Sequence, residues 1–159
     1  MEKLRIHDYI HPARIACLQA CASKKSSLEM LGTLLADSTP DLNQLEIFDS
    51  LLSRERLGST GLGNGVALPH GRIQGLKKPL CALLTLENGV DFDATDKKPV
   101  DIMFALIVPE ESTDDHLQLL AEFARLFSQQ GFCSHLRKMK DADECYEFLQ
   151  GQEQQSMSA

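Results

Sequence analysis

The residues best suited to chemistry lie in one glycine-rich stretch, from residue 54 to residue 72. It reads RERLGSTGLGNGVALPHGR and has His70 near its end. A neutral imidazole is a nucleophile or a base near pH 7 when a hydrogen bond fixes its second ring nitrogen. The guanidinium groups of Arg54 and Arg56, upstream in the same stretch, are able to bind phosphoryl oxygens in pairs. The sequence therefore predicts a reactive histidine in surroundings that suit a dianion.

The glycines of this stretch predict a loop. Four of them fall between residues 58 and 65, where they permit positive φ and a close approach of the backbone to a ligand. We expect their N–H groups and the hydroxyls of Ser59 and Thr60 to cradle the anion. A dinucleotide-binding motif is excluded because Val66 stands where a third glycine is required. A Walker loop is excluded because its Gly-Lys-Ser/Thr is absent.

Neighbouring elements must present the histidine and the arginines. Residues 66–68 form a short apolar run, and Pro69 favours extended geometry before it, so we expect a strand that stops at His70, on the rim of a sheet. Arg54 and Arg56 fall in the last turn of a predicted helix, where cations suit the negative end of the helix dipole, so a structural role for one of them stays open. Being two residues apart, they cannot share a face, and we expect one to point into the site and the other outward.

The same stretch resembles a known family. The run Arg54-Glu55-x-x-Gly-Ser-Thr-Gly-x-Gly-Asn-Gly-x-Ala-x-Pro-His-Gly resembles the IIA domain of the mannitol/fructose class of the bacterial sugar phosphotransferase system. Segments 23–25, 92–94, 99–101, 104–106 and 108–109 recur in the same order, and the resemblance covers about residues 10–150. It is strongest to the nitrogen-regulatory members. Sugar-specific members often carry an acidic residue where this chain has Asn64, which favours the regulatory branch.

The resemblance implies roles for particular residues. His70 would accept a phosphoryl group as a tele-phosphohistidine, Arg54 would steady that group, and His116 would be the second active-site histidine. Ser59, Thr60 and Asn64 complete the expected phosphoryl-binding set. The donor would be a histidine phosphocarrier of the HPr or NPr type. In the regulatory branch, the phosphorylation state would tune binding to potassium-transport proteins, sensor kinases or other targets.

Three alternatives stay open. A sugar-specific IIA protein would pass the phosphoryl group to a IIB cysteine. A hydrolase or isomerase could use His70 and His116 as an acid/base pair, although no serine or cysteine motif supplies a nucleophile. An interaction module could have the same fold without phosphotransfer.

Bulk composition narrows the class of protein. The 159 residues predict a single domain, 1–159, with a core at about 10–150 and a flexible tail at 152–159. The net charge of −7 disfavours a nucleic-acid partner. No apolar stretch is long enough to insert into a membrane, and residues 1–5 do not begin a secretion signal, so we expect a cytoplasmic protein.

We expect neither a metal nor a cofactor. The five cysteines include Cys17-x-x-x-Cys21 but no second ligand pair, which favours reduced, buried thiols. Asp91, Asp93 and Asp96 have an incomplete calcium-loop spacing, because the required glycine and terminal glutamate are missing.

The pattern of the whole chain predicts an α/β fold with α+β character. Residues 15–18 predict a strand, Ser23 caps a helix that ends at Thr39-Pro40, and a second helix starts near Asn43. The apolar runs 80–86 and 102–108 predict central strands, with a half-exposed strand at 90–93 between them. Three helices follow. The first starts at Ser112 or Thr113 and ends at Gly131, and the last ends at Gly151. Between them we expect a short helical segment in which His135 is exposed and has no role. Strands without a polar face need helices on both sides, so we expect a three-layer α/β/α sandwich around a mixed sheet.

Overall fold

The centre of the molecule is a mixed sheet of six strands. The computed structural model describes residues 6–112 and 115–158. The strands follow the order β1-β5-β6-β3-β2, and β4 also pairs with β6. Parallel pairs join β1 to β5 and β3 and β4 to β6, whereas β5–β6 and β2–β3 are antiparallel. Their bounds are β1 Ile15–Gln19, β2 Gly61–Gly63, β3 Val66–Ala67, β4 His70–Ile73, β5 Leu80–Val90 and β6 Val100–Pro109.

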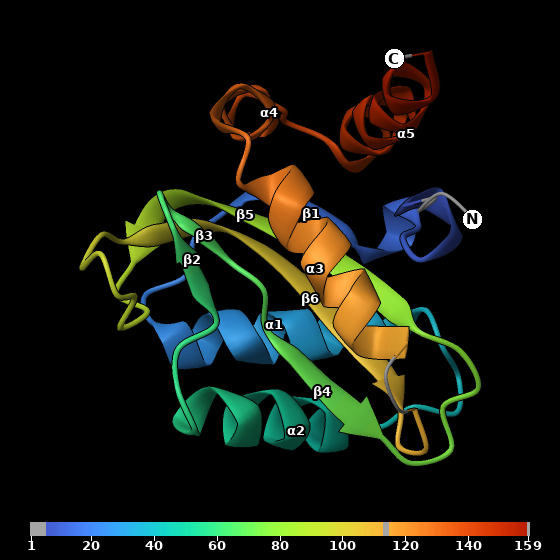
Figure 1. Cartoon of the computed structure of the whole chain (residues 1–159). Helices are drawn as coiled ribbons and strands as arrows, with labels where there is room; N and C mark the ends of the chain where they lie inside the picture. Colours follow the sequence, from blue (N-terminus) through green and yellow to red (C-terminus); the bar gives the residue numbers. More distant parts are fainter. Residues whose placement is uncertain (1–5, 113–114, 159) are drawn as a thin grey trace.

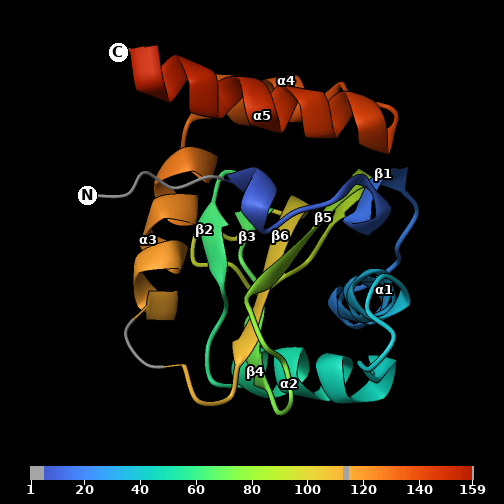
Figure 2. The same cartoon turned by 90° about the vertical axis from the view of Figure 1, so that its right-hand side faces the viewer.

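Helices cover both faces of this sheet, as Figures 1 and 2 show. Helices α1 (Lys24–Asp37) and α2 (Gln44–Arg56) lie on one side. Helices α3 (Asp115–Phe127), α4 (Gln130–Arg137) and α5 (Ala142–Ser158) lie on the other, together with the short 3-10 helices η1 (Ile6–Asp8) and η2 (Pro12–Arg14). Among the described helices, none combines the length and the apolar character needed to cross a bilayer.

Alternation along the central strands produces two cores. On β6, Phe104 and Leu106 are buried with the side chains of α3, α4 and α5, whereas Met103 and Ala105 are buried with those of α1 and α2. The ring of Phe104 lies with its centroid 4.8 Å from those of both Phe123 and Phe127. The near-continuous apolar runs are therefore central strands covered on both faces, and the predicted three-layer α/β/α sandwich is confirmed.

Two predicted helix starts are confirmed by their caps. The Ser23 hydroxyl accepts from the Ser26 N–H, and the Ser26 side chain accepts in turn from the Ser23 N–H. The Asn43 side chain accepts from the N–H groups of Leu45 and Glu46 at the start of α2. These caps satisfy N–H groups that the first turn of a helix leaves without partners.

Two predicted helix ends are wrong, because Gly131 and Gly151 lie inside helices. Helix α3 ends at Phe127, and Gly131 lies inside α4, whose buried stripe of Phe132, Cys133 and Leu136 outweighs the cost of a helical glycine. Helix α5 continues through Gly151 to Ser158. The mobility expected of residues 152–159 stays a prediction.

One further local expectation is wrong, one falls outside the described residues and one is confirmed. No separate strand forms at residues 90–93, since β5 runs on to Val90 and the Asp93 N–H then donates to the Asp91 side chain in a turn. Thr113, one of the two predicted caps before α3, lies outside the described residues. His135 is exposed as expected, but its ring stacks on Phe148 with centroids 4.6 Å apart.

The five cysteines are free thiols. Four are buried and Cys21 is half-buried, so four of the five thiols are packed as small apolar side chains, as predicted. Cys17 and Cys145 lie in contact between β1 and α5, with 3.0 Å between their sulfur atoms.

Candidate functional site

The site begins at an interruption in the sheet. Strands β3 and β4 lie along the same edge of β6 in one register, with Ala67 opposite Met103 and His70 opposite Leu106. Leu68 and Pro69 separate the two strands. His70 is therefore the first residue of β4, whereas a strand ending at His70 was predicted. Pro69 interrupts the strand without ending its path along β6, a partner that the local sequence does not reveal.

This interruption fixes the ring of His70. The Leu68 carbonyl lies 2.9 Å from Nδ1 of His70. Since a carbonyl only accepts hydrogen bonds, Nδ1 of the neutral ring carries the proton and donates it. The other nitrogen, Nε2, is left with an in-plane lone pair, which is the tautomer a nucleophilic or basic histidine needs.

Arg54 contacts that second nitrogen. Its Nε lies 3.2 Å from Nε2 of His70, and its Nη1 donates to the Gly58 carbonyl at 2.9 Å. Arg54 is half-buried and Arg56 is exposed, so one arginine points into the site and the other outward.

The environment lowers the pKa of His70 below its ordinary value. Burial is the largest cause, and the charges of Arg54 and His116 act in the same direction. The hydrogen bond to Leu68 and the charge of Glu55 oppose the shift. The imidazole of His70 is therefore neutral near pH 7 and available for attack.

His116 comes from the opposite side of the sheet edge. It lies in the first turn of α3, is half-buried, and is close enough to His70 to lower its pKa. Its Nδ1 is buried, and within the described part of the chain this nitrogen has no hydrogen-bond partner. A buried polar atom without a partner is costly, and such an atom in a site is ready to bind a ligand.

The glycine-rich stretch is a hairpin rather than an anion-binding loop. Strands β2 and β3 pair antiparallel around Asn64 (φ 56°) and Gly65 (φ 86°), and an Asn-Gly pair with positive φ at both positions is typical of a tight hairpin turn. The Asn64 N–H donates to Asp96, and its carbonyl accepts from Arg137. Asn64 precedes His70 by six residues of mostly extended chain, roughly 20 Å at the rise of a strand. The structure therefore does not bring Asn64 to the site.

The hydroxyls of Ser59 and Thr60 also have other partners. Ser59 donates to the Phe92 carbonyl and accepts from the Gly61 N–H. Thr60 is buried and donates to Glu55 at 2.6 Å. Neither hydroxyl is hydrogen-bonded to His70, so the expected cradle is not assembled from them.

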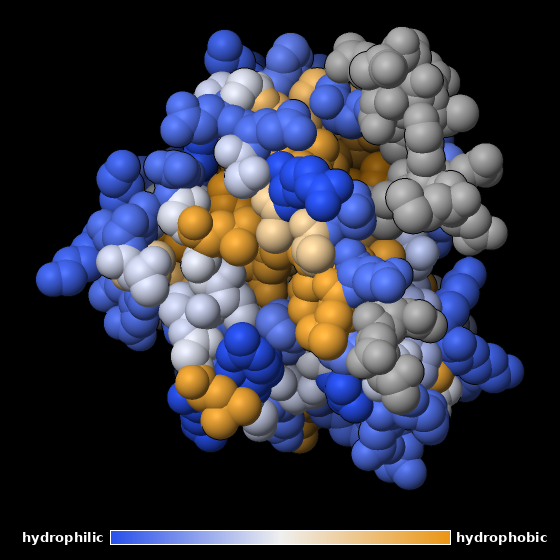
Figure 3. Space-filling model, in the orientation of Figure 1, coloured by the Kyte–Doolittle hydropathy of each residue, from blue (hydrophilic) through white to orange (hydrophobic). Residues whose placement is uncertain are grey.

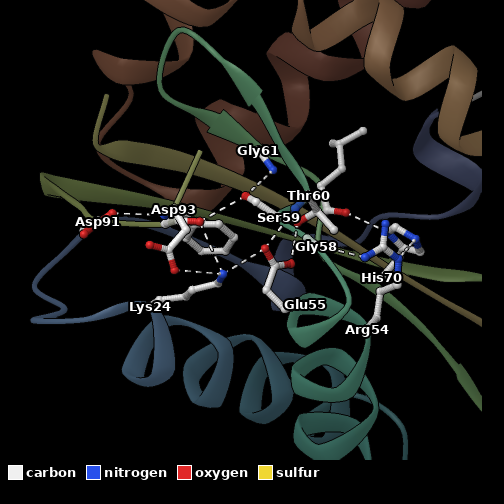
Figure 4. A network of polar contacts seen from close by, with 12 residues as sticks. Lys24, Arg54, Glu55, Gly58, Ser59, Thr60, Gly61, His70, Asp91 and Asp93 are labelled. Atoms are coloured by element: carbon white, nitrogen blue, oxygen red, sulfur yellow. Dashed lines mark hydrogen bonds and ion pairs between the residues drawn. The ribbon is translucent and has the colours of Figure 1, made fainter. Parts of the chain in front are cut away.

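Glu55 is the residue that sequence reasoning missed. It is buried at the C-terminal end of α2, and its carboxylate accepts from the Thr60 N–H and lies 3.1 Å from Nζ of Lys24 (Figure 4). The one sequence feature that could have drawn attention to Glu55 is its place beside Arg54. However, a glutamate in an amphipathic helix is normally exposed, and only the tertiary structure shows that this one is not.

Three exposed leucines lie near the site residues in sequence. Leu57 after α2 is 84% exposed, Leu62 on β2 is 40% exposed and Leu117 on α3 is 57% exposed. They flank Arg54, the hairpin and His116 in sequence. Figure 3 shows apolar atoms reaching the surface over the region where α2 ends and β2 begins. Exposed apolar side chains around a polar centre are typical of a protein-docking surface.

The described residues contain no group of three or more histidine, cysteine, aspartate or glutamate side chains placed to hold a metal ion. The side chains of Asp91 and Asp96 instead accept hydrogen bonds from backbone N–H groups.

Comparisons with known proteins identify the family of this chain. Residues 8–152 match the family model described as the phosphoenolpyruvate-dependent sugar phosphotransferase system, EIIA 2. The chain is 39% identical over 146 residues to a nitrogen regulatory protein from Pseudomonas aeruginosa, covering 92% of this chain and 95% of the relative.

Two solved structures have the same fold. The nitrogen regulatory protein IIA-Ntr from Neisseria meningitidis superimposes with a TM-score of 0.83 at 39% identity, covering 91% of this chain and 98% of the other. The mannitol IIA protein from Escherichia coli superimposes with a TM-score of 0.72 at 20% identity, covering 87% and 97%. The protein therefore belongs to the EIIA 2 family of the phosphoenolpyruvate-dependent sugar phosphotransferase system.

Proposed function

We propose that this protein is a regulatory phosphocarrier of the nitrogen type, which accepts a phosphoryl group on His70 from an HPr-like carrier of the NPr type. The observation that carries the proposal is the hydrogen bond from Nδ1 of His70 to the Leu68 carbonyl. It leaves Nε2 unprotonated, beside a guanidinium group, in a ring whose pKa is lowered.

The chemistry would be an in-line displacement. The phosphorus–nitrogen bond on the carrier's histidine breaks as the bond to Nε2 of His70 forms. If the donor ring enters protonated on its second nitrogen, it leaves as a neutral imidazole. His70 keeps its Nδ1 proton, so its ring becomes cationic and offsets one of the two negative charges of the phosphoryl group. The reaction asks for positioning and charge stabilisation and for no further reactant.

Arg54 and His116 would stabilise the transferred group. Phosphorus must take the place on Nε2 that the Arg54 guanidinium now contacts, so this side chain would move from the ring nitrogen to the equatorial oxygens. Guanidinium groups bind such oxygens in pairs. His116, whose buried Nδ1 lacks a partner among the described residues, would donate to another oxygen.

The carrier would dock on the exposed leucines. Leu57, Leu62 and Leu117 are exposed and lie near the site residues in sequence, and burial of such side chains stabilises protein–protein contacts. After transfer, the same surface would carry a dianion, which favours or disfavours partners by charge alone. We infer that regulatory targets read this surface, in the cytoplasm where the carrier is made. Potassium-transport proteins and sensor kinases are the classes that the family resemblance suggests.

Incubation with the phosphorylated carrier tests the proposal. We expect an acid-labile, base-stable adduct that is absent in His70→Ala and present in His135→Ala, which removes an exposed histidine outside the site. Turnover of a small substrate without an adduct would instead identify a hydrolase or isomerase, and partner binding without an adduct an interaction module. Rapid loss of the adduct to a IIB cysteine would place the protein in the sugar-transport branch.

A further inference from the structure

Glu55 occupies an unfavourable position. Glu55 is only 4% exposed. It lies in the last turn of α2, where the helix dipole disfavours negative charge. Burial of a carboxylate is costly unless donors surround it. The donors are Nζ of Lys24 at 3.1 Å, the Thr60 N–H at 2.9 Å and the Thr60 hydroxyl at 2.6 Å. The fold therefore compensates this carboxylate with groups from two other segments.

Lys24 is itself fixed by several contacts. Its Nζ lies 4.7 Å from the centre of the Phe92 ring, 3.3 Å from the Phe92 carbonyl and 4.0 Å from the Asp93 carboxylate. Figure 4 shows Lys24 and Glu55 pointing toward each other, with Thr60 on the far side of the carboxylate. The cluster thus joins the start of α1, the end of α2, the segment leading into β2 and the segment after β5.

A path of hydrogen bonds leads from this cluster to the ring of His70. The Thr60 N–H donates to Glu55, the Leu68 N–H donates to the Thr60 carbonyl at 3.1 Å, and Nδ1 of His70 donates to the Leu68 carbonyl. Each link restrains the residue that makes the next one. The Glu55 carbonyl also accepts from the Gly58 N–H at 3.2 Å, and the Gly58 carbonyl accepts in turn from Arg54. The residue that follows Arg54 in sequence therefore restrains both partners of the Arg54–His70 contact.

We propose that Glu55 is a positioning residue: through Thr60 and Leu68 it fixes the tautomer and orientation of His70, and through the last turn of α2 it holds Arg54 on Nε2. Glu55 touches neither the reacting nitrogen nor the incoming group. The inference extends the proposed phosphoryl transfer at His70 and rests on it for its kinetic consequences, whereas its effect on the ring does not depend on that function.

The charged groups around His70 make the effect measurable. Arg54 and Glu55 face it from α2 and His116 from α3, and the Leu68 carbonyl faces it from the chain before β4. The charge of Glu55 and the bond to Leu68 both raise the pKa of His70. Removal of the Glu55 charge, with loosening of that bond, should therefore lower the pKa further.

The test compares Glu55→Gln, Thr60→Val and Lys24→Met with the wild type, and Lys25→Met is the matched control because Lys25 is the exposed neighbour of Lys24. Nitrogen-15 NMR of the imidazole reports tautomer and pKa, and single-turnover transfer from the phosphorylated carrier reports the rate. Glu55→Gln should lower the His70 pKa, mix the two ring tautomers and slow transfer roughly 10- to 100-fold, the loss that small misplacements cause. Lys25→Met should match the wild type.

A double variant shows whether Lys24 and Glu55 act together or contribute to the transfer rate independently. If Lys24 acts through Glu55, the double variant Lys24→Met/Glu55→Gln should transfer no more slowly than Glu55→Gln. An unchanged ring and a rate within about twofold of wild type in folded Glu55→Gln and Thr60→Val would overturn the proposal. Should Glu55→Gln fail to fold, Thr60→Val decides. If the wild type forms no adduct, the proposed function fails, while the NMR comparison still decides the role of Glu55.

Discussion

Arg54 and His70 are 16 positions apart in sequence, and the Nε of the first lies 3.2 Å from the Nε2 of the second. The contact covers the lone pair that attack requires. A guanidinium group in this position helps to keep the ring neutral, because its charge lowers the pKa of His70. It also stands where phosphoryl oxygens would arrive.

Replacement of Arg54 tests this contact directly. Arg54→Ala should slow phosphoryl transfer roughly 100- to 1,000-fold, the loss measured when one donor is removed from a transition-state site. Arg54→Lys should recover only part of the rate, since an ammonium cannot bind two oxygens in a planar fork. Arg56→Ala, which removes the exposed arginine, is the control and should transfer normally. Equal rates in all three variants would remove Arg54 from the site.

The lowered pKa of His70 predicts a dependence of stability on pH. Between the unfolded value of about 6.5 and the lower folded value, the unfolded chain binds more protons at this residue. The contribution of His70 to the free energy of unfolding therefore decreases as the pH falls through that window. Below the window it does not change further. Urea unfolding at about pH 7.5 and about pH 5.5 should show a smaller acid loss in His70→Gln than in wild type. An equal or larger loss in the variant would mean that the folded pKa is not lowered.

Docking of the carrier should depend on Leu57. Leu57→Gln removes an exposed apolar side chain without adding charge, so the field at His70 is preserved while contact with the carrier weakens. We expect an increase in the apparent KM for the phosphorylated carrier of roughly tenfold, as for a contact worth about 1.4 kcal/mol. Leu45→Gln alters an exposed leucine at the other end of α2 and should leave the KM unchanged. Parallel changes in both variants would argue against this docking surface.

Asn64 provides a test of the hairpin. Asn64→Ala should leave transfer unchanged but lower the free energy of unfolding by about 1–2 kcal/mol, because alanine is strained at a φ of 56°. Asn64→Gly, which tolerates that conformation, should be close to wild type in both measurements. A marked loss of transfer in both folded variants would return Asn64 to the site.

Much of the architecture could be predicted because its signals are local. Ser23 and Asn43 cap helices wherever such residues precede an amphipathic run, and the apolar runs of β5 and β6 need cover on both faces whatever surrounds them. The chemistry and spacing of the glycine-rich stretch identify His70 and a pair of arginines, and the family resemblance selects Arg54 from that pair. The structure brings His70 and Arg54 together.

The predictions that fail have two causes. Some depend on contacts between residues distant in sequence, and others depend on a local pattern that has more than one structural meaning. The Asn64-Gly65 pair was itself a hairpin signal, but the four glycines favoured a loop. The hydroxyls of Ser59 and Thr60 are bound by Phe92 and Glu55, and nothing local indicates that Glu55 is buried. Gly131 and Gly151 predict helix ends but lie inside helices, because an isolated glycine only weakens a helix.

At the Leu68–Pro69 interruption, the backbone keeps its alignment in the sheet and also offers one carbonyl to a side chain. The Gly65 and Pro69 carbonyls accept from N–H groups of β6, whereas the Leu68 carbonyl between them faces the other way and binds the imidazole. The chain keeps its alignment with β6 on either side. One backbone carbonyl can thus orient the reactive histidine without a change in strand register. Substitutions around this peptide should change reactivity and folding independently, which makes it a suitable place to redesign what the histidine accepts.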